Sequence, residues 1–401
     1  MNSRFLTGIL SLIATLAGQA QEIPWKLETF SSAPKSVPAE EIVEEGVRSI
    51  YFEGPPFGGK PTKVFAFLGV PENASPEKRV PGIVLLHGGG GTASARWVRL
   101  WNKRGYAAIA VDHFGGLPVK DAAGGWKRNP FGGPNHDGGA KVHEPYENQW
   151  MFHAVANTLL ANSLLGSLPE VDENRIGLSG ISWGGVLACT VSGVDPRFRF
   201  VAPVYGCGYI SDLSEDGSRF VGKNLPVEQA ERWRALWDPA NYLPRSTAPI
   251  LWVTGTNDFA FTLRALLQSY KAAKGPHFLC IRMNMPHGQQ EGENPEEIRA
   301  FADSIVNDGK PLPKILASGK EEGLAWVEFE SPVPIHKVEF IYSRYRGSWQ
   351  NRKWETLPAK LSPDGTGRAF VERPKGVKAS FFNITDERGL TISSEPDLGL
   401  K

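Results

Sequence analysis

The sequence predicts an α/β fold, in which helices cover both faces of a mainly parallel sheet, followed by a small C-terminal antiparallel β-sandwich. The first observation is that unbroken apolar runs such as "PGIVLL" alternate with segments of helical period between about residues 80 and 308. Such runs are typical of strands buried on both faces of a parallel sheet. The second is that residues 318 to 397 contain only short alternating runs at hairpin spacing, which is typical of a β-sandwich.

The elements follow one another in a regular order. After a polar start, "GVRSIYFEG" and "KVFAFLGVP" predict two strands joined by the turn-rich "PPFGG". The later buried strands are expected in "PGIVLL", "YAAIAVDHF", "RIGLSG", "VAPVYG", "APILWVTG" and "HFLCIRMN". The helices are expected in "ARWVRLWNKRG", "ENQWMFHAVANTLLANSLL", the segment after "GISWGG", "FTLRALLQSYKAAKG" and "PEEIRAFADSIVND".

These patterns divide the chain into an α/β domain over residues 21–310 and a β-sandwich domain over residues 318–401. Two insertions, near 115–146 and 208–243, interrupt the first domain and are rich in Gly, Pro or aromatic residues. Loops of this length in a compact domain are usually functional or disordered. Both insertions follow strands at the carboxyl edge of the sheet, where open α/β folds bind ligands, so we expect them to form the wall or lid of a pocket.

The first twenty residues, "MNSRFLTGILSLIATLAGQA", have the pattern of a signal peptide. Arg4 precedes an apolar core from Phe5 to Leu16, and Gly18-Gln19-Ala20 forms a small-x-small cleavage site. A buried N-terminal helix or a membrane anchor is the alternative, but the apolar run is short for a membrane span. We therefore expect a secreted or periplasmic protein with no membrane association after cleavage.

The composition argues against several classes of partner and cofactor. A formal net charge of +1 without basic or acidic blocks gives no electrostatic basis for binding nucleic acid. The odd number of cysteines, Cys189, Cys207 and Cys280, leaves at least one thiol free, and a Cys189–Cys207 disulfide is left open. The spacing of His136, Asp137, His143 and Glu144 is too irregular for a metal site. We therefore expect no metal and no cofactor.

Ser182 is the candidate nucleophile. It lies in "GISWGG", a G-x-S-x-G sequence between an expected strand and an expected helix, which is the arrangement that exposes a reactive serine on a sharp turn. A Gly-rich turn without chemistry is the alternative, since the chain contains 44 glycines. A serine nucleophile also requires a base, an acid that orients the base, and donors for the developing oxyanion.

The other parts of such a site are found in the expected chain order of serine, acid and histidine. Asp258 follows the strand "ILWVTG" and is the candidate acid, although an Asp there could simply cap the next helix. His287, in the loop after the next strand, is the candidate general base and acid, whereas His277 precedes that strand at its wrong end. The backbone N–H groups of Gly89, in "LLHGGGG", and Trp183 are the expected oxyanion donors. We expect His87 to brace the glycines.

On these residues the chain resembles the α/β-hydrolase superfamily, and within it the dienelactone-hydrolase-like and acetyl xylan esterase group. The resemblance covers roughly residues 47 to 308, through "LLHGGGG", "VDENRIGLSGISWGG", "VTGTNDFAF" and "MPHG". It implies a triad of Ser182, Asp258 and His287. Dienelactone hydrolases carry cysteine at the nucleophile position, so the serine favours an esterase. Acetyl xylan esterases of the seventh carbohydrate-esterase family usually show H-G-Y and G-x-S-Q-G. This chain has Gly89 in place of that tyrosine and Trp183 in place of that glutamine.

The leading hypothesis is a secreted serine esterase that acts on an acylated carbohydrate or a small ester. Trp126, Trp233 and Trp237 are candidate substrate-binding residues that could stack on sugar rings or aromatic acyl groups, although such tryptophans also fill small cores. A serine peptidase of the prolyl-oligopeptidase type is the main alternative, and we expect no room for its β-propeller before residue 47. A non-catalytic glycan-binding protein on a hydrolase scaffold is the third possibility.

Overall fold

The computed structural model describes residues 23–210, 221, 225–362 and 367–399. The predicted signal peptide, residues 1–20, and part of the 208–243 insertion lie outside these ranges. Among the described residues, no helix combines the length and the apolar character needed to cross a bilayer. The three cysteines are buried and carry free thiols, so Cys189 and Cys207 are not joined.

Six parallel strands form the centre of the molecule, as the apolar runs predict. Their spatial order is β5, β4, β8, β9, β10, β11. Their bounds are Ala107–Val111 (β5), Val80–Leu86 (β4), Val171–Ile181 (β8), Val201–Val204 (β9), Ile250–Gly255 (β10) and His277–Arg282 (β11). Nearly every side chain of β4, β5, β9 and β10 is buried, because helices cover both faces of this part of the sheet.

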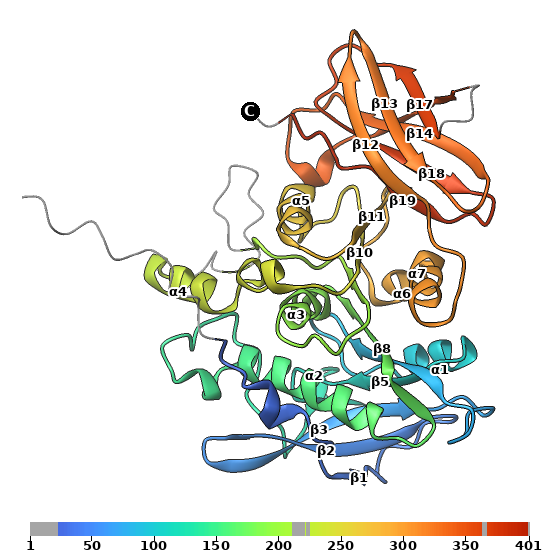
Figure 1. Ribbon diagram of the computed structural model, residues 1–401. Helices are drawn as coiled ribbons and strands as arrows, with labels where there is room; N and C mark the ends of the chain where they lie inside the picture. The colour runs from blue at the N-terminus through green and yellow to red at the C-terminus, as the bar shows by residue number, and fades with distance from the viewer. Residues whose placement is uncertain (1–22, 211–220, 222–224, 363–366, 400–401) are drawn as a thin grey trace, which may run out of the picture.

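The helices lie in two layers on either side of this sheet (Figure 1). One layer contains α1 (Ala95–Lys103), α6 (Gln289–Glu293) and α7 (Glu296–Val306), and the other contains α2 (Trp150–Gly166), α3 (Trp183–Ser192) and α5 (Leu263–Ala272). All but the last residue of α2 are buried, whereas α1 is strongly amphipathic. The predicted α/β class is therefore confirmed.

Antiparallel strands extend both edges of the sheet. At the β5 edge lie β3 (Lys60–Gly69), β2 (Arg48–Phe57) and β1 (Ser36–Pro38). At the β11 edge the order continues through β19 (Thr391–Ser393), β18 (Ala379–Asp386), β14 (Ile335–Ser343) and β15 (Glu355–Pro358). A separate sheet contains β12 (Lys314–Glu321), β13 (Leu324–Glu330), β17 (Arg368–Glu372) and β16 (Lys360–Leu361).

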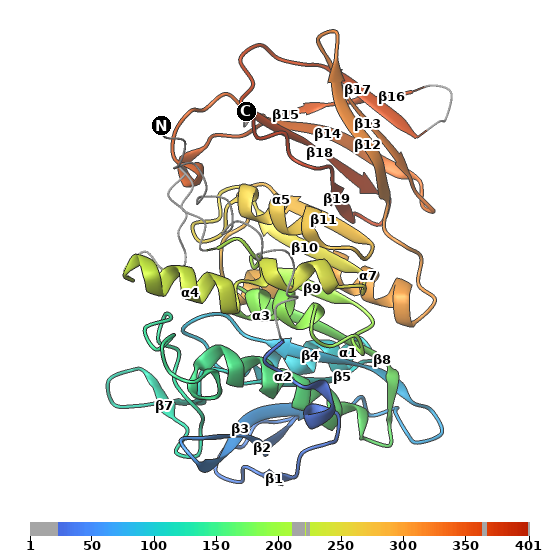
Figure 2. The ribbon, with the colours of Figure 1, turned by 60° about the vertical axis from the view of Figure 1, so that its left-hand side comes forward.

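The described residues from 314 to 399, called here the C-terminal β-region, are thus more closely joined to the preceding α/β region than the sequence predicted. The four-stranded sheet packs over β14 and β18 around Val327, Phe340 and Phe382, which gives the expected antiparallel sandwich. One of its two sheets, however, is a direct continuation of the central sheet through the β11–β19 pairing (Figure 2). Strand patterns along the sequence cannot reveal this pairing, because it joins segments more than one hundred residues apart.

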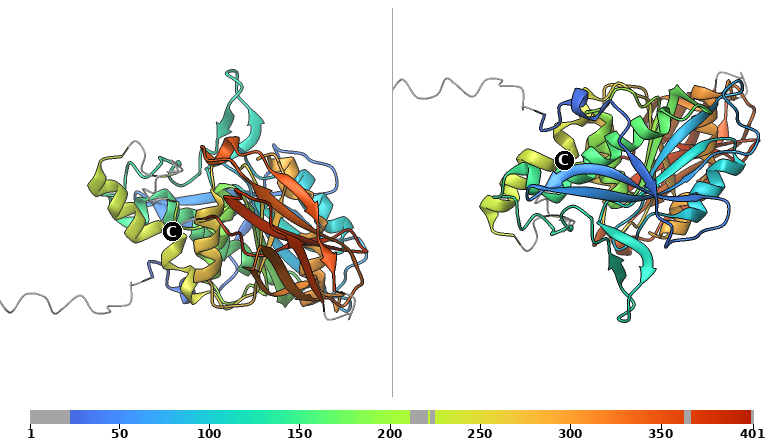
Figure 3. Two further views of the ribbon diagram at one scale, coloured as in Figure 1. Left: turned by 90° about the horizontal axis from the view of Figure 1, so that it is seen from above. Right: turned by 90° about the horizontal axis from the view of Figure 1, so that it is seen from below.

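The two insertions form small elements outside the central layers. The first contains a hairpin of β6 (Gly116–Lys120) and β7 (Trp126–Arg128), which projects from the body of the molecule (Figure 3). The described part of the second contains α4 (Val227–Trp237). Both follow central strands at their carboxyl ends, after β5 and β9 respectively.

Candidate active site

Ser182 occupies a strained turn between β8 and α3. Its φ of 56° and ψ of −116° lie outside the regions that L-residues normally adopt, a strain typical of functional turns. The turn is possible because glycines flank it. A Cβ atom on Gly180 would overlap the carbonyl of Gly184, and one on Gly184 would overlap the carbonyl of Leu86. The local sequence therefore folds as the strand–turn–helix arrangement that the G-x-S-x-G pattern indicates.

Asp258, His287 and Ser182 form a continuous hydrogen-bonded series. Nδ1 of His287 lies 2.6 Å from Oδ2 of Asp258, and Nε2 of the same ring lies 2.9 Å from the Ser182 hydroxyl oxygen. In a neutral imidazole, an Nδ1–H that donates to the carboxylate leaves Nε2 free to accept from the hydroxyl group. Ser182 is only 7% exposed and Asp258 only 2%, so the hydrogen bonds are largely screened from water.

The surroundings fix the orientation of Asp258 and His287. The second carboxylate oxygen of Asp258 accepts the backbone N–H groups of Ala260 and Phe261, both at 2.8 Å. The imidazole stacks on the Tyr205 ring at a centroid distance of 4.6 Å. The phenol of Tyr205 in turn donates to the carbonyl of Pro286, the residue before His287, at 2.8 Å. Sequence reasoning missed Tyr205, because nothing in "VAPVYGCG" places it beside a residue 82 positions away.

The glycine loop, Gly88–Gly91, lies at the end of β4 beside the start of α3. Trp183 is the first residue of α3, so its N–H lies at the helix N-terminus, where backbone N–H groups and the helix dipole favour negative charge. Its indole packs directly on Gly89: a Cβ atom there would come within 2.8 Å of the indole Cδ1. A side chain on Gly89 would therefore collide with the indole unless one of them shifted.

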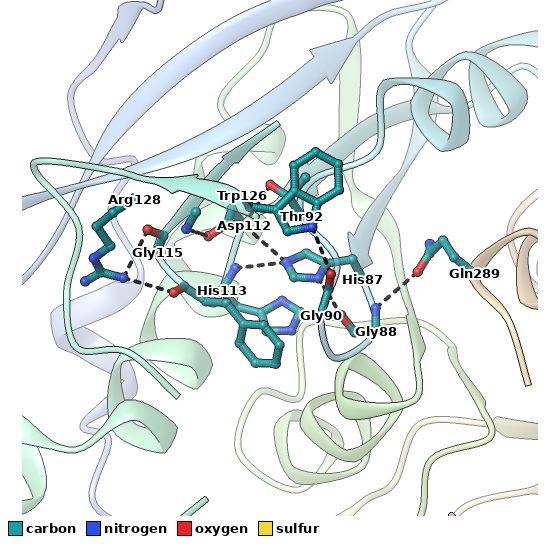
Figure 4. Close-up of polar contacts among 12 residues, drawn as sticks. His87, Gly88, Gly90, Thr92, Asp112, His113, Gly115, Trp126, Arg128 and Gln289 are labelled. Atoms are coloured by element: carbon teal, nitrogen blue, oxygen red, sulfur yellow. Dashed lines mark hydrogen bonds and ion pairs between the residues drawn. The ribbon is translucent and has the colours of Figure 1, made fainter. Parts of the chain in front are cut away.

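His87 braces this loop, as expected from the sequence (Figure 4). Its Nδ1 lies 2.8 Å from the Gly88 carbonyl oxygen, and its Nε2 accepts the His113 N–H at 3.4 Å. Nε2 also lies 3.4 Å from Oδ2 of Asp112, whose other contacts are to the Thr92 hydroxyl and the Gly116 N–H. The imidazole is buried and has no contact that suggests proton transfer to a substrate.

Two residues that sequence reasoning missed also hold the glycine loop. The side-chain oxygen of Gln289 accepts the Gly88 N–H at 3.1 Å, which connects the loop to the residues just after His287 (Figure 4). His113 stacks on His87 at 3.9 Å, and neither of its ring nitrogens has a hydrogen-bond partner among the described residues. Burial lowers the pKa of His113 well below its ordinary value, with His87 as a second cause, so the ring is neutral.

The candidate substrate-binding tryptophans have different surroundings. Trp233 and Trp237 lie on one face of α4, as their spacing predicts, but they are 2% and 1% exposed. Trp237 packs against Trp25 and donates to the Gln149 side chain. The prediction that these two rings stack on substrate is therefore wrong, because both are enclosed in the protein core, which was the alternative.

Trp126 lies closer to the site. Its indole N–H donates to the carbonyl of Gly90 at 2.8 Å, so the projecting hairpin is attached to the glycine loop (Figure 4). The ammonium group of Lys120 covers its ring at 3.3 Å from the centroid. Phe259, which sequence reasoning did not single out, lies against His287 at 4.7 Å and is 65% exposed. Its position next to Asp258 in the sequence was the available signal.

The remaining candidates lie apart from this centre. His277 begins β11 at the opposite end of the strand from His287, and its Nδ1 contacts the Gly275 carbonyl oxygen. His136 packs among the rings of Phe114, Trp150 and Trp183. Within the described ranges, no group of three or more His, Cys, Asp or Glu side chains could hold a metal ion.

The chain has the α/β-hydrolase fold. Two family profiles match the chain, each over less than half its length. The acetyl xylan esterase (AXE1) profile matches residues 41–215, and the prolyl oligopeptidase profile matches residues 129–305. The resemblance to the acetyl xylan esterase group that the motifs indicated is thus confirmed.

One curated acetyl esterase also matches part of the chain. The acetyl esterase Axe7A of Xylanibacter ruminicola is 27% identical over 118 residues, which is 28% of this chain and 27% of that protein. The chain therefore matches only about a quarter of the length of this curated relative.

Solved structures show the same fold at low identity. The acetyl xylan esterase of Paenibacillus sp. R4 has a TM-score of 0.55 at 19% identity, over 70% of this chain and 92% of that one. Acetyl xylan esterase 1 of Thermoanaerobacterium sp. JW/SL YS485 has a TM-score of 0.53 at 17% identity, over 70% and 90%. A Mycobacterium tuberculosis puromycin-hydrolyzing peptidase has a TM-score of 0.50 at 19% identity, over 68% and 41%.

Proposed function

We propose that this protein is a serine carboxylic ester hydrolase that removes acyl groups, acetyl above all, from an acylated carbohydrate or a small ester. The single observation that carries the proposal is the hydrogen-bonded series from Asp258 through His287 to Ser182, on a turn with positive φ. The match to the acetyl xylan esterase profile and to an acetyl esterase supports the choice of an ester substrate.

The chemistry follows from the roles these groups can take. His287 accepts the Ser182 proton as the hydroxyl oxygen attacks the ester carbonyl, and Asp258 stabilises the resulting imidazolium. The backbone N–H groups of Trp183 and Gly89 bind the oxyanion. His287 then gives the proton to the departing alcohol, which leaves an acyl group on Ser182. Water, activated by the same imidazole, hydrolyses this acyl-enzyme and regenerates the serine.

The side chains next to Ser182 favour a short acyl group. The Trp183 indole is 7% exposed and lies on Gly89, and it packs edge-on against Trp150 at 5.3 Å and His136 at 4.7 Å. We infer that this aromatic cluster leaves little room for a long acyl chain on the glycine-loop side of the serine. The exposed Phe259, on the His287 side, offers a flat apolar surface to the alcohol part of the substrate.

A substrate panel tests the proposal. The purified protein is assayed with p-nitrophenyl esters of increasing acyl length, feruloyl esters, acetylated xylan and peptide anilides. We expect turnover of acetyl esters to exceed that of longer ones, and no turnover of the anilides. Faster hydrolysis of anilides than of acetyl esters would instead establish a serine peptidase. That second candidate is favoured by the prolyl oligopeptidase profile match over residues 129–305.

We also propose that the protein is exported, on the strength of the charged, apolar and small-x-small pattern of its first twenty residues. Expression of the full chain in a bacterial host tests this. The mature protein is expected outside the cytoplasm with Gln21 as its first residue. A cytoplasmic product that still begins at the initiator methionine would contradict export.

A further inference from the structure

The loop that carries Asp258 is bonded to the C-terminal β-region. This acid loop, Thr256–Asp258, follows β10 directly. The side-chain amide of Asn257 donates to two backbone carbonyls, those of Gln350 at 3.0 Å and Arg352 at 2.8 Å. The reverse orientation of the amide would set its oxygen against two carbonyl oxygens, so the bonding pattern itself determines which atom is nitrogen. Both donors of this amide are therefore used between segments more than ninety residues apart.

The same series continues to the loop that carries His287, called here the base loop, Met283–His287. The oxygen of the Asn257 amide accepts from the Thr256 hydroxyl at 2.7 Å, and that hydroxyl oxygen accepts the Asn284 N–H at 3.0 Å. Thr256 is fully buried. Hydrogen bonds of Asn257, Thr256 and Asn284 thus connect the C-terminal β-region, the acid loop and the base loop in one continuous series.

The two carbonyls are held in place by packing within the C-terminal β-region. Trp349 is buried, and the Arg352 guanidinium lies over its ring at 4.3 Å. Trp354 packs edge-on against Trp349 at 5.7 Å and against Phe381 of β18 at 5.6 Å. Because these aromatic contacts fix the segment from 349 to 354 on the sheet, its carbonyls are a rigid support for Asn257.

The β-region is also attached to β11, the strand that leads into the base loop. The Ile281 N–H donates to the Ser393 hydroxyl at 2.7 Å, and the Ile281 carbonyl accepts from the Asn383 amide at 3.0 Å. Asn383 and Ser393 are buried and bonded to each other. The support for the acid loop and the support for β11 are therefore parts of one packed unit.

We propose that Asn257 is a positioning residue through which the C-terminal β-region fixes Asp258 and His287 relative to each other. The inference rests on the proposed function, in which His287 moves the serine proton. The 2.6 Å bond joins loops from two neighbouring strands, and each loop could otherwise shift independently. Misplacement of a catalytic group by about 1 Å can lower a rate about 100-fold, so a support of this kind has a direct kinetic consequence.

Two variants of Asn257 in the full-length protein test this. Asn257→Ala removes both donors, and Asn257→Asp keeps the shape but sets a carboxylate against two carbonyls. For both we expect kcat on p-nitrophenyl acetate to fall about 10- to 100-fold with KM changed less than about threefold, because proton transfer rather than substrate binding is disturbed. Labelling of Ser182 by a fluorophosphonate probe should slow in parallel. If Asn257 only stabilised the fold, its replacement would lower the amount of folded enzyme but would leave the kcat of the folded fraction unchanged.

The matched control is Asn102→Ala. Asn102 is also half-buried, and its amide donates to a backbone carbonyl, that of Tyr106 at 2.9 Å, at the end of α1. We expect this variant to keep its kcat and its labelling rate. Thr256→Val, which removes the linking hydroxyl, should reproduce the loss seen in Asn257→Ala, and the double variant should lose less than the product of the two effects.

The outcomes separate the two proposals. Suppose that the wild-type protein is active and is labelled by the probe. If Asn257→Ala then stays within about twofold of it in kcat and in labelling rate, the positioning role is overturned but the proposed function stands. Multiplicative effects of Thr256→Val and Asn257→Ala overturn the positioning role as well. A wild-type protein that neither turns over esters nor reacts with the probe refutes the proposed function itself. If Asn257→Ala does not fold, Asn257→Asp and Thr256→Val decide the question by the same measurements.

Discussion

The two sides of the candidate site are held by different parts of the chain. On the oxyanion side, the glycine loop is braced by His87, Gln289 and the Trp126 indole, all of which belong to the hydrolase region and its first insertion. On the acid–base side, the acid and base loops are linked through Asn257 and Thr256 to carbonyls of the C-terminal β-region. Gln289 lies two residues after His287 and so links the two sides, whereas Gly89 and Asn257 can each be changed on one side alone.

This difference reflects what each side must do. In the proposed mechanism, oxyanion donors are backbone dipoles that act best when they are fixed before the reaction, and the hydrogen bonds to the glycine loop provide this. The acid and base instead come from two separate loops whose relative position must be kept while a proton moves. Because the central sheet continues past β11 into the C-terminal β-region, this one region is bonded both to the acid loop and to the strand that leads into the base loop. The C-terminal β-region is thus part of the scaffold of the site as well as an addition to it.

The largest effect is expected where the two sides meet, at Ser182. Ser182→Ala should lower kcat on p-nitrophenyl acetate about 10⁴-fold or more, because loss of the nucleophile disables both sides together. Urea unfolding should change little. Ser167→Ala, an exposed serine at the end of α2, is the control and should stay fully active. Activity that survives in Ser182→Ala would mean that another residue is the nucleophile.

The oxyanion side alone is tested at Gly89. Gly89→Ala places a Cβ atom 2.8 Å from the Trp183 indole, so the loop or the indole must shift. We expect kcat to fall about 10²- to 10³-fold, the usual cost of losing one oxyanion donor. Steady-state kinetics on an acetyl ester measure this.

A double variant checks the cause of that loss. Trp183→Ala keeps the backbone N–H but removes the indole, so in combination with Gly89→Ala it should restore part of the activity. If the double variant is no better than Gly89→Ala, the clash with the indole is not the reason for the loss, and the packing account of this side fails.

A smaller effect is expected at Gln289. Gln289→Leu leaves the Gly88 N–H without its side-chain acceptor, and such an unsatisfied group costs about 1–3 kcal/mol, equivalent to about a tenfold or larger loss of kcat if the loop shifts. Gln290→Leu, the exposed neighbour, should behave like wild type. In a double-variant cycle, Gly89→Ala and Asn257→Ala should act independently, since they disturb opposite sides. Strong coupling between them would refute the division into two sides.

The smallest expected effect is on stability, through His113. Its pKa is lowered by burial, so below about pH 6.5 the unfolded chain binds a proton that the folded chain excludes. The free energy of unfolding should therefore fall as pH decreases below about 6.5, by up to about 1.4 kcal/mol per pH unit from this group. His113→Phe should reduce this slope, because the variant lacks the imidazole that takes up the proton in the unfolded chain.

Urea titrations at pH 7.5 and pH 5.5 measure that slope. His336→Phe, at an exposed position, is the control and should leave it unchanged. An identical slope in His113→Phe would show that other groups, such as His136 and His153, whose pKa values burial also lowers, carry the acid sensitivity.

Much of the site could be predicted because its signals are local. The strained serine turn is encoded by glycines within five residues of Ser182, and the ends of β10 and β11 mark the positions of Asp258 and His287. The tryptophans on α4 could not be assigned, because the spacing of Trp233 and Trp237 defines a shared face but not what that face meets. Gln289, Tyr205 and Asn257 were missed for the same reason, since each acts on a residue from a distant segment.

Local patterns along the chain were enough to predict the class of the fold and the order of the catalytic candidates. Apolar runs, helical periods and glycine turns are set by neighbouring residues, so they can be read along the chain. Only the tertiary structure decided that β19 pairs with β11, that Asn257 contacts Gln350 and Arg352, and that Trp237 is buried. These contacts depend on which faces and edges meet when distant segments pack. The free energy of that packing is a property of the whole chain, and no local pattern contains it.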